Sequence, residues 1–285
     1  MNESPVRTQP YDQLLAAADY PPWHGPPQRS LIIGTFQRSG STLLAEAMYF
    51  AGGMGCPHEY FSSGFRPVME RRWHPPDLRS YVADLHRFRT DPSGVFAIKL
   101  FWSDIFEFVR EWQRGEFEGL AGAPAWSIGA ETYRTILTTL SEALPNPTFV
   151  HLTRRDKIRQ AISLAIAGQT DVWRQYSSID IKAAGFQPVY RFDEIVQFLA
   201  AIQNSDALWL SFFRANGLAY HEIAYEDLAE DYTGTLRKLF DRLGRGGAAI
   251  PAPRLRKHTE AYARQWLGRF TEEFRARTRG EKARG

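Results

Sequence analysis

Short apolar runs alternate with longer amphipathic stretches along most of the chain. The runs Leu31–Ile33, Val95–Leu100 and Thr148–Leu152 have the character of buried strands, and a fourth run lies near Tyr220–Ile223. Between them, apolar residues recur at helical spacing in Leu43–Met48, Asp104–Trp112, Tyr133–Leu144, Ile158–Ile166, Phe192–Ala215 and Leu236–Leu243. Strands that alternate with helices predict an α/β fold with a central parallel sheet flanked by helices.

Proline and glycine divide the chain unevenly. Residues 1–30 contain six of the 17 prolines, which predicts a leader that wraps the surface or stays mobile. The glycine-rich stretch Gly119–Gly129 is typical of a surface loop. We therefore expect a leader over residues 1–30 and a single α/β domain over residues 31–285, with a loop- and helix-rich insertion.

The segment Gly34–Thr42 lies directly between the first strand and the first helix. A turn there directs successive backbone N–H groups and the positive end of the helix dipole at a bound phosphate. Gly40 allows close approach, Ser41 and Thr42 carry hydroxyl donors, and Arg38 adds a permanent charge. The segment is therefore a candidate phosphate-binding loop, and the alternative is an ordinary strand–turn–helix with a polar cap.

This loop differs from that of nucleoside triphosphatases. Their pattern G-x-x-x-x-G-K-[ST] requires glycine at position 39 and lysine at position 40, where this chain has Ser39 and Gly40. The cation lies before the glycine instead, at Arg38. Hydrolysis of ATP is therefore disfavoured, although a P-loop kinase or other nucleotide phosphotransferase remains the alternative enzyme.

The pattern [KR]-S-G-[ST]-[ST] after a first strand resembles the 5′-phosphosulfate loop of sulfotransferases that use 3′-phosphoadenosine-5′-phosphosulfate (PAPS). The resemblance implies a P-loop-like fold, PAPS as donor, adenosine 3′,5′-bisphosphate as product, and no metal. It also implies that the loop residues contact the donor, namely Gln37, Arg38, Ser39, Gly40, Ser41 and Thr42. A Y-E-D-L segment at Tyr225–Leu228 is also similar to the family, and we expect it to be structural.

A second segment, Arg154–Ser163, resembles the part of these enzymes that holds the 3′-phosphate. There an arginine at a strand end and a serine on the next helix bind one anion. Ser163 matches the serine, and either Arg154 or Arg155 matches the arginine. We favour Arg154 because it directly follows the strand.

Within the sulfotransferases, the chain is most similar to the bacterial carbohydrate branch typified by trehalose 2-sulfotransferase. The matching stretches are Gln37–Leu44, Glu59–Phe61, Lys99–Trp102, Arg154–Ser163 and the region of Trp266. In that branch a glutamate of an E-[FY]-F segment acts as general base, which implies this role for Glu59. His58 departs from the branch and is a second candidate base, since histidine titrates near neutrality.

The resemblance and the chemistry together suggest further roles. Arg38 and Lys99 could stabilise the charge that develops on the leaving phosphate, with a paired core lysine as the alternative for Lys99. The aromatic residues near the base suit a sugar ring, so His58, Tyr60, Phe61 and Trp102 are candidate acceptor contacts. Lys257 and Arg264 lie where these enzymes close a loop over PAPS, and we expect Lys257 to contact the donor.

Composition narrows the function further. The 285 residues are 44% hydrophobic, carry a net charge of +3 and contain one cysteine, Cys56. No apolar run approaches a membrane span, and no secretory signal or nucleic-acid motif is evident. We expect a soluble, cytoplasmic carbohydrate sulfotransferase acting on trehalose, a glycolipid or a lipopolysaccharide-type sugar, with a homodimer implied by resemblance alone. A nonenzymatic nucleotide- or polyanion-binding protein, using the basic C-terminal segment, is the alternative from another class.

Overall fold

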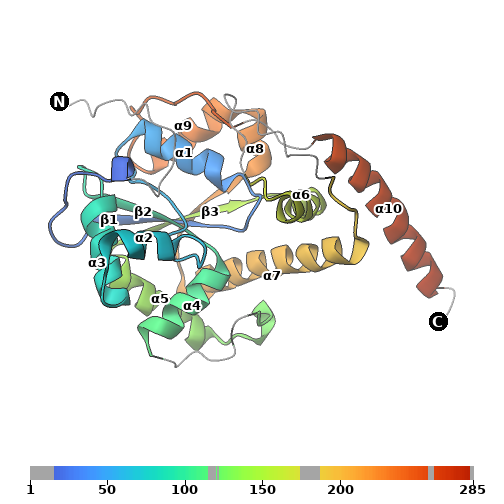
Figure 1. Cartoon of the computed structure of the whole chain (residues 1–285), viewed down its shortest axis with the longest axis horizontal. Coiled ribbons are helices and arrows are strands. Elements are labelled where there is room, and N and C mark those ends of the chain that lie inside the picture. Colours follow the sequence, from blue (N-terminus) through green and yellow to red (C-terminus); the bar gives the residue numbers. More distant parts are fainter. Residues whose placement is uncertain (1–15, 115–119, 121, 174–186, 256–259, 283–285) are drawn as a thin grey trace. The chain divides into compact units, whose positions relative to one another are not determined.

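A computed structural model of the chain describes residues 16–114, 120, 122–173, 187–255 and 260–282 (Figure 1). The chain divides into two compact units. The first comprises Met1–Thr153 with Asn204–Ala252, and the second comprises Arg154–Gln203 with Pro253–Gly285. The single domain expected over residues 31–285 stays a prediction.

The first unit is built on four parallel strands. They are β1 (Arg29–Gly34), β2 (Val95–Leu100), β3 (Pro147–Thr153) and β4 (Tyr220–Ala224). Their order in the sheet is β2-β1-β3-β4, and the predicted α/β fold with a parallel sheet is confirmed. Since β1 lies between β2 and β3, the order of strand addition reverses at β1, which is where open α/β sheets bind ligands.

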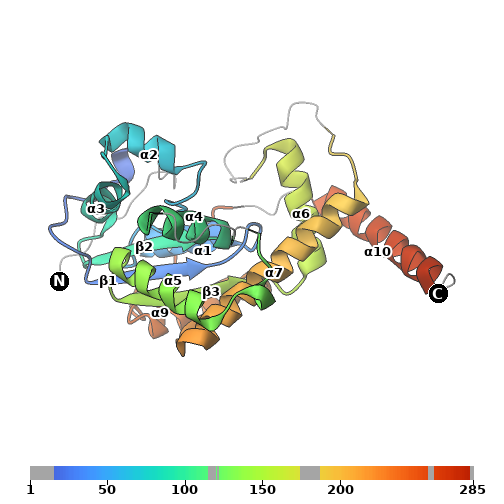
Figure 2. The same cartoon turned by 90° about the horizontal axis from the view of Figure 1, so that it is seen from below.

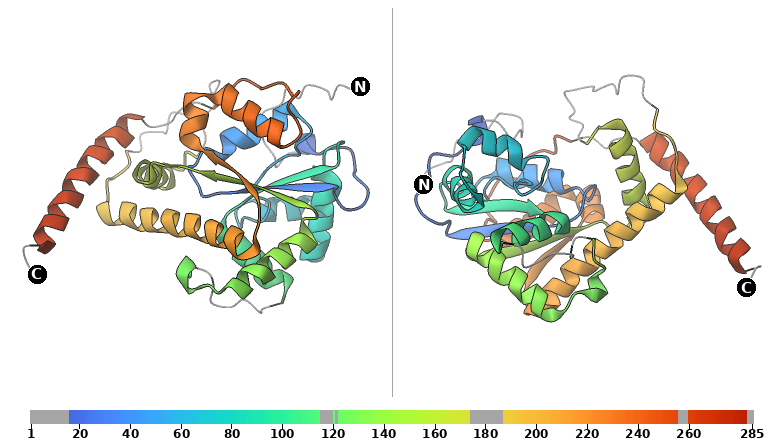
Figure 3. Two further views of the ribbon diagram at one scale, coloured as in Figure 1. Left: turned by 180° about the vertical axis from the view of Figure 1, so that it is seen from behind. Right: turned by 60° about the horizontal axis from the view of Figure 1, so that its bottom comes forward.

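Helices cover both faces of this sheet (Figures 1 and 2). The elements on one face are α3 (Leu78–Arg89), α4 (Trp102–Trp112), α5 (Ala130–Ala143) and the C-terminal half of α7 (Phe192–Asn216). On the other face are α1 (Ser41–Ala51), α8 (Tyr225–Glu230) and α9 (Tyr232–Arg242), as the view from behind also shows (Figure 3).

Each strand contributes to both cores because successive side chains point to opposite faces. On β1, Ile32 packs in the core with α3 to α5, whereas Leu31 and Ile33 pack in the core with α1 and α9. All three are fully buried. Apolar runs without alternation are therefore what a parallel sheet covered on both faces requires.

Helices α2 (Arg66–Trp73) and α3 are absent from the expectations drawn from the sequence. Helix α3 begins at an Asp77 N-cap, whose carboxylate accepts from the Ser80 amide at 2.7 Å. Part of the proline-rich leader packs against its end, where the Tyr20 amide donates to the Phe88 carbonyl at 2.9 Å. Residues of the leader therefore belong to the folded unit.

The second unit contains α6 (Lys157–Thr170), the N-terminal half of α7 and α10 (Glu260–Lys282). Asp156 caps α6 by accepting from the Arg159 amide at 2.9 Å. Phe192 of α7 stacks on Phe270 of α10 with ring centroids 5.0 Å apart. In the part of the chain that the structure describes, no helix combines the length and the apolar character needed to cross a membrane.

Candidate functional site

The candidate phosphate loop connects β1 to α1. Its backbone contains two residues with positive φ, Arg38 at 63° and Gly40 at 84°. The turn ends at Ser41, where α1 begins, so the first amides of α1 have no partner within the helix. Such amides at a helix N-terminus form a favourable anion site.

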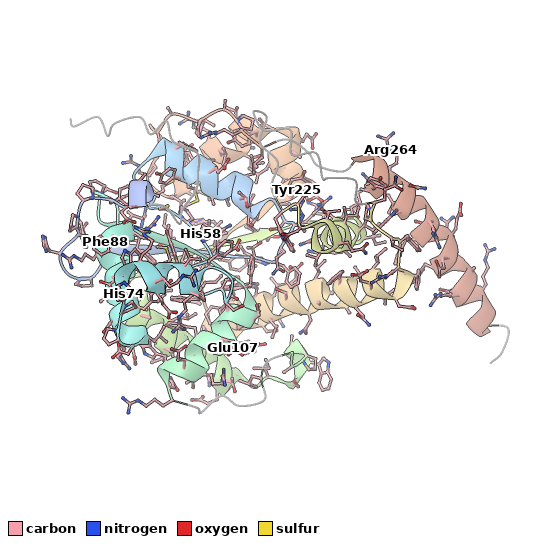
Figure 4. All side chains as sticks on the ribbon, in the orientation of Figure 1. His58, His74, Phe88, Glu107, Tyr225 and Arg264 are labelled. Atoms are coloured by element: carbon pink, nitrogen blue, oxygen red, sulfur yellow. The ribbon has the colours of Figure 1, made fainter. Side chains whose placement is uncertain are left out.

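Two glycines of this region are required by close packing. A Cβ atom on Gly40 would lie 2.6 Å from Cδ2 of Tyr225, and a Cβ atom on Gly34 would lie 2.7 Å from Cζ2 of Trp209. Tyr225 is the first residue of α8 (Figure 4), so the Y-E-D-L segment packs directly against the loop. The loop is thus shaped by the end of β4 as well as by its own sequence.

Two buried hydroxyl groups link the loop to the sheet. Thr35 Oγ1 lies 2.7 Å from the Leu152 carbonyl of β3 and 2.6 Å from Ser39 Oγ. The Thr35 amide also donates to the Leu100 carbonyl of β2 at 3.1 Å. Thr35 therefore bonds to both neighbours of β1, and both it and Ser39 are only 1% exposed.

Glu59 and Lys99 form an ion pair at the C-terminal end of β2. Lys99 Nζ lies 2.8 Å from Glu59 Oε1, and the side chains are 0% and 15% exposed, respectively. In the sheet Lys99 is the register partner of Ile33, the residue before Gly34. The structure therefore brings together two predicted site residues, at the strand end next to the phosphate loop.

His58, labelled in Figure 4, forms hydrogen bonds with the backbone of both members of this pair. Its Nδ1 accepts from the Glu59 amide at 2.7 Å, and its carbonyl accepts from the Lys99 amide at 2.8 Å. The side chain is 1% exposed. This geometry favours a role in orienting Glu59, and the earlier expectation of a base or acceptor contact at His58 stays a prediction.

A second carboxyl group, on Asp104, was missed by the sequence reasoning. It lies in the first turn of α4, and one of its oxygens is buried with no hydrogen-bond donor among the described residues. Burial raises the pKa of Asp104 to about 7, and the negative charge of Glu59 adds to the rise. Its position five residues after Lys99, just past a strand end, is the signal that could have found it.

The three aromatic residues expected to contact an acceptor are buried in the core. The Tyr60 hydroxyl donates to the Cys56 carbonyl at 2.6 Å. The ring of Phe61 stacks on that of Phe108 with centroids 4.1 Å apart, and the rings of Trp102 and Trp209 have centroids 5.1 Å apart. Packing explains each of these side chains, so their contact with an acceptor stays a prediction.

The second predicted phosphate segment begins the second unit. Arg154 follows β3 and is half-buried, Arg155 is exposed, and Ser163 is half-buried on α6. The choice of Arg154 over Arg155 as the ligand stays a prediction. Lys257 lies outside the described residues, and Arg264 is exposed on α10 (Figure 4).

Within the described ranges, no three histidine, cysteine, aspartate or glutamate side chains are grouped as metal ligands. The residues described above offer amide, guanidinium and hydroxyl groups at the loop, and a carboxylate paired with an ammonium beside it. Such a set can bind an anionic group and accept a proton from a neighbouring hydroxyl.

The four-stranded parallel sheet flanked by helices, with a glycine-bearing loop after β1, defines an α/β protein. Comparison of sequences identifies the family. The chain belongs to the Stf0 sulphotransferase family, whose model matches residues 30–273. It is therefore a sulfotransferase by family, and the predicted resemblance is confirmed.

Two relatives are both trehalose 2-sulfotransferases. The chain is 28% identical over 271 residues to a trehalose 2-sulfotransferase of Mycobacterium tuberculosis, covering 85% of this chain and 94% of the relative. It is 23% identical over 268 residues to a trehalose 2-sulfotransferase of Mycolicibacterium smegmatis, covering 83% and 92%. The similarity thus extends over nearly the whole of both relatives.

Proposed function

We propose that this sulfotransferase transfers the sulfuryl group of PAPS to a hydroxyl group of a carbohydrate, with Glu59 as general base. One observation carries the proposal: the Glu59–Lys99 pair lies at the end of β2, in register with the residue before the phosphate loop. A proton acceptor and an anion site are thus held by neighbouring strands.

The chemistry requires both parts. The acceptor oxygen attacks sulfur while its proton passes to the Glu59 carboxylate, and the bond between sulfur and the departing phosphate oxygen breaks. Glu59 is 15% exposed, so a hydroxyl group can reach it, while the fully buried Lys99 fixes its orientation. The negative charge gained by the leaving phosphate is stabilised by the loop amides and by Arg38. Lys99 is paired with Glu59, and its part in stabilising the leaving phosphate stays a prediction.

The loop residues suit a phosphosulfate group. Gly40 has no side chain, so the Tyr225 ring packs directly on it, and no side chain caps the first amides of α1, which can bind an anion. We propose Gln37, Arg38, Gly40, Ser41 and Thr42 as contacts of the 5′-phosphosulfate. By family resemblance, Arg154 and Ser163 would bind the 3′-phosphate and Lys257 the nucleotide.

The acceptor is proposed from the relatives. Both are trehalose 2-sulfotransferases, so trehalose is the first acceptor to test, followed by glycolipid and lipopolysaccharide-type sugars. A cytoplasmic location and a homodimer stay predictions.

Calorimetric titration with adenosine 3′,5′-bisphosphate tests the donor. We expect tight binding that does not depend on Mg²⁺, and weaker binding of ATP with or without Mg²⁺. Preference for ATP with Mg²⁺ would instead support a nucleotide phosphotransferase. The absence of any nucleotide binding would reject both enzymes.

The base is tested with Glu59→Gln in an assay that detects sulfated trehalose by mass spectrometry. Turnover should fall by about 10²–10⁴ while the affinity for adenosine 3′,5′-bisphosphate is retained. His58→Ala is the comparison variant. If it abolishes turnover while Glu59→Gln does not, the base has been assigned to the wrong residue.

A further inference from the structure

The hydroxyl groups of Thr35 and Ser39 form a chain whose hydrogen-bond directions can be worked out. The Leu152 carbonyl oxygen can only accept, so the contact of 2.7 Å from Thr35 Oγ1 requires Thr35 to donate. A hydroxyl group has one proton, and the other carbonyl near it, that of Phe36, is farther away at 3.3 Å. In the hydrogen bond of 2.6 Å between the two hydroxyl groups, Ser39 must therefore be the donor and Thr35 the acceptor.

This direction decides what Ser39 can do for a ligand. Its one hydroxyl proton is used inside the protein, in a bond between two side chains that are each 1% exposed. Ser39 is therefore unable to donate that proton to a bound phosphate without breaking the chain. The serine of the family pattern, Ser39 in this chain, would then maintain the shape of the loop and would not contact the ligand through its hydroxyl.

The chain also closes over a strained part of the loop. Thr35 and Ser39 flank Arg38, whose φ of 63° is unfavourable for a residue with a Cβ atom. Such a conformation persists where its surroundings fix it from several sides. Thr35 provides this restraint through bonds to β2, to β3 and to Ser39.

We propose that Thr35 and Ser39 are positioning residues. Their hydroxyl groups form a chain of two hydrogen bonds, from Ser39 to Thr35 and from Thr35 to the Leu152 carbonyl, which holds the phosphate loop in its binding conformation and is called the relay below. The inference rests on the proposed function, because that function supplies the phosphate group that the loop binds. It assigns donor contacts to the loop amides and Arg38, and it removes the Ser39 hydroxyl from the contacts implied by the resemblance.

Binding of adenosine 3′,5′-bisphosphate to four variants tests the relay. Thr35→Val and Ser39→Ala should each weaken binding about tenfold, and Thr35→Ser, which keeps the hydroxyl, should stay within about twofold of the unmodified protein. The double variant Thr35→Val/Ser39→Ala should bind no more weakly than either single variant, because both remove one unit. Additive losses, about a hundredfold in the double variant, would mean that Ser39 contacts the phosphate itself and would overturn the relay.

Thr139→Val is the matched control. Thr139 is also a fully buried threonine whose hydroxyl accepts from a side chain, Gln113, and donates to a backbone carbonyl, that of Thr135 at 3.0 Å. It lies on α5, away from the loop in the sequence. The control should lower the melting temperature and leave nucleotide affinity unchanged. If Thr139→Val weakened nucleotide binding as much as Thr35→Val, removal of any buried hydroxyl would have this effect and the relay would be overturned.

Amide hydrogen exchange of residues 36–42 without nucleotide separates the relay from the proposed function. Thr35→Val and Ser39→Ala should each accelerate exchange of the loop about tenfold, and their double variant should exchange no faster. Thr35→Ser and Thr139→Val should leave loop exchange unchanged. If the unmodified protein fails to bind the nucleotide while these exchange differences hold, the proposed donor is wrong and the relay stands. Equal exchange in all five variants would overturn the relay.

Discussion

The Glu59–Lys99 pair permits a quantitative test that does not depend on the activity. The ammonium of Lys99 is fully buried, while Glu59 keeps 15% of its side-chain surface exposed. Water can therefore solvate the Glu59 carboxylate when Lys99 is removed, but it cannot solvate the Lys99 ammonium when Glu59 is removed. Removing the negative charge should cost more than removing the positive one.

The expected magnitudes follow from this asymmetry. Glu59→Gln keeps an oxygen that can accept from Lys99 but leaves a buried charge uncompensated, which should cost about 3 kcal/mol, the lower end for a broken buried pair. Lys99→Met leaves a carboxylate that water reaches, with a cost of about 1–3 kcal/mol. The double variant has neither charge and should lie within about 1 kcal/mol of the unmodified protein.

Urea denaturation followed by circular dichroism measures the free energy of unfolding of the two single variants and of the double variant. With a slope of about 3 kcal/mol/M, Glu59→Gln should lower the midpoint by about 1 M, and the double variant should shift it by about 0.3 M or less. The signature is that the second substitution restores stability. If the double variant is destabilised by the sum of the single losses, the two charges do not interact and the reasoning is refuted.

Two further predictions concern the residues around this pair. Gly40→Ala should abolish nucleotide binding measured by calorimetry, because the new methyl group would meet the Tyr225 ring at 2.6 Å on a backbone with φ of 84°; unchanged affinity would show that the loop adapts. The pKa of Asp104 is raised to about 7 by burial and then by the charge of Glu59, so the folded state keeps a proton between pH 4 and 7 that the unfolded state releases. Stability of the unmodified protein relative to Asp104→Asn should therefore fall over this range as pH rises, by up to about 4 kcal/mol, and a constant difference in urea midpoints would contradict the shift.

The strands were predictable because burial of a sheet on both faces requires uninterrupted apolar runs, which are easily found in a sequence. All four apolar runs proved to be strands, with bounds extended by one or two residues at some ends. Helix α3 was missed although Leu78, Tyr81 and Leu85 are buried at helical spacing after an N-cap at Asp77. Arg79, Arg87 and Arg89 make the segment polar on average, which obscured the apolar stripe. Helix α10 was treated as a basic segment, although Trp266 and Phe270 follow the same spacing.

The candidate site was predictable only as far as short motifs extend. The loop and Glu59 stand in contiguous patterns, so the sequence could indicate them. The orientation of His58 depends on a hydrogen bond to the next amide, and the pKa of Asp104 depends on burial by the fold. Thr35 precedes the motif, and its importance comes from Leu152, which is 117 residues away in the chain. Contacts between residues so far apart in the chain leave no pattern in the local sequence.

The position of β1 explains why these tertiary contacts accumulate around one loop. Thr35 bonds through its amide to β2 and through its hydroxyl to β3, and the strand that holds Lys99 is the same β2. A shift of β1 relative to β2 would therefore displace the loop from Glu59, and displacements of about 1 Å are enough to impair a reaction that depends on alignment. Burying a lysine is costly unless it is paired. In this protein the buried pair ties the carboxylate to the strand that also anchors the loop, so one element sets the distance between them.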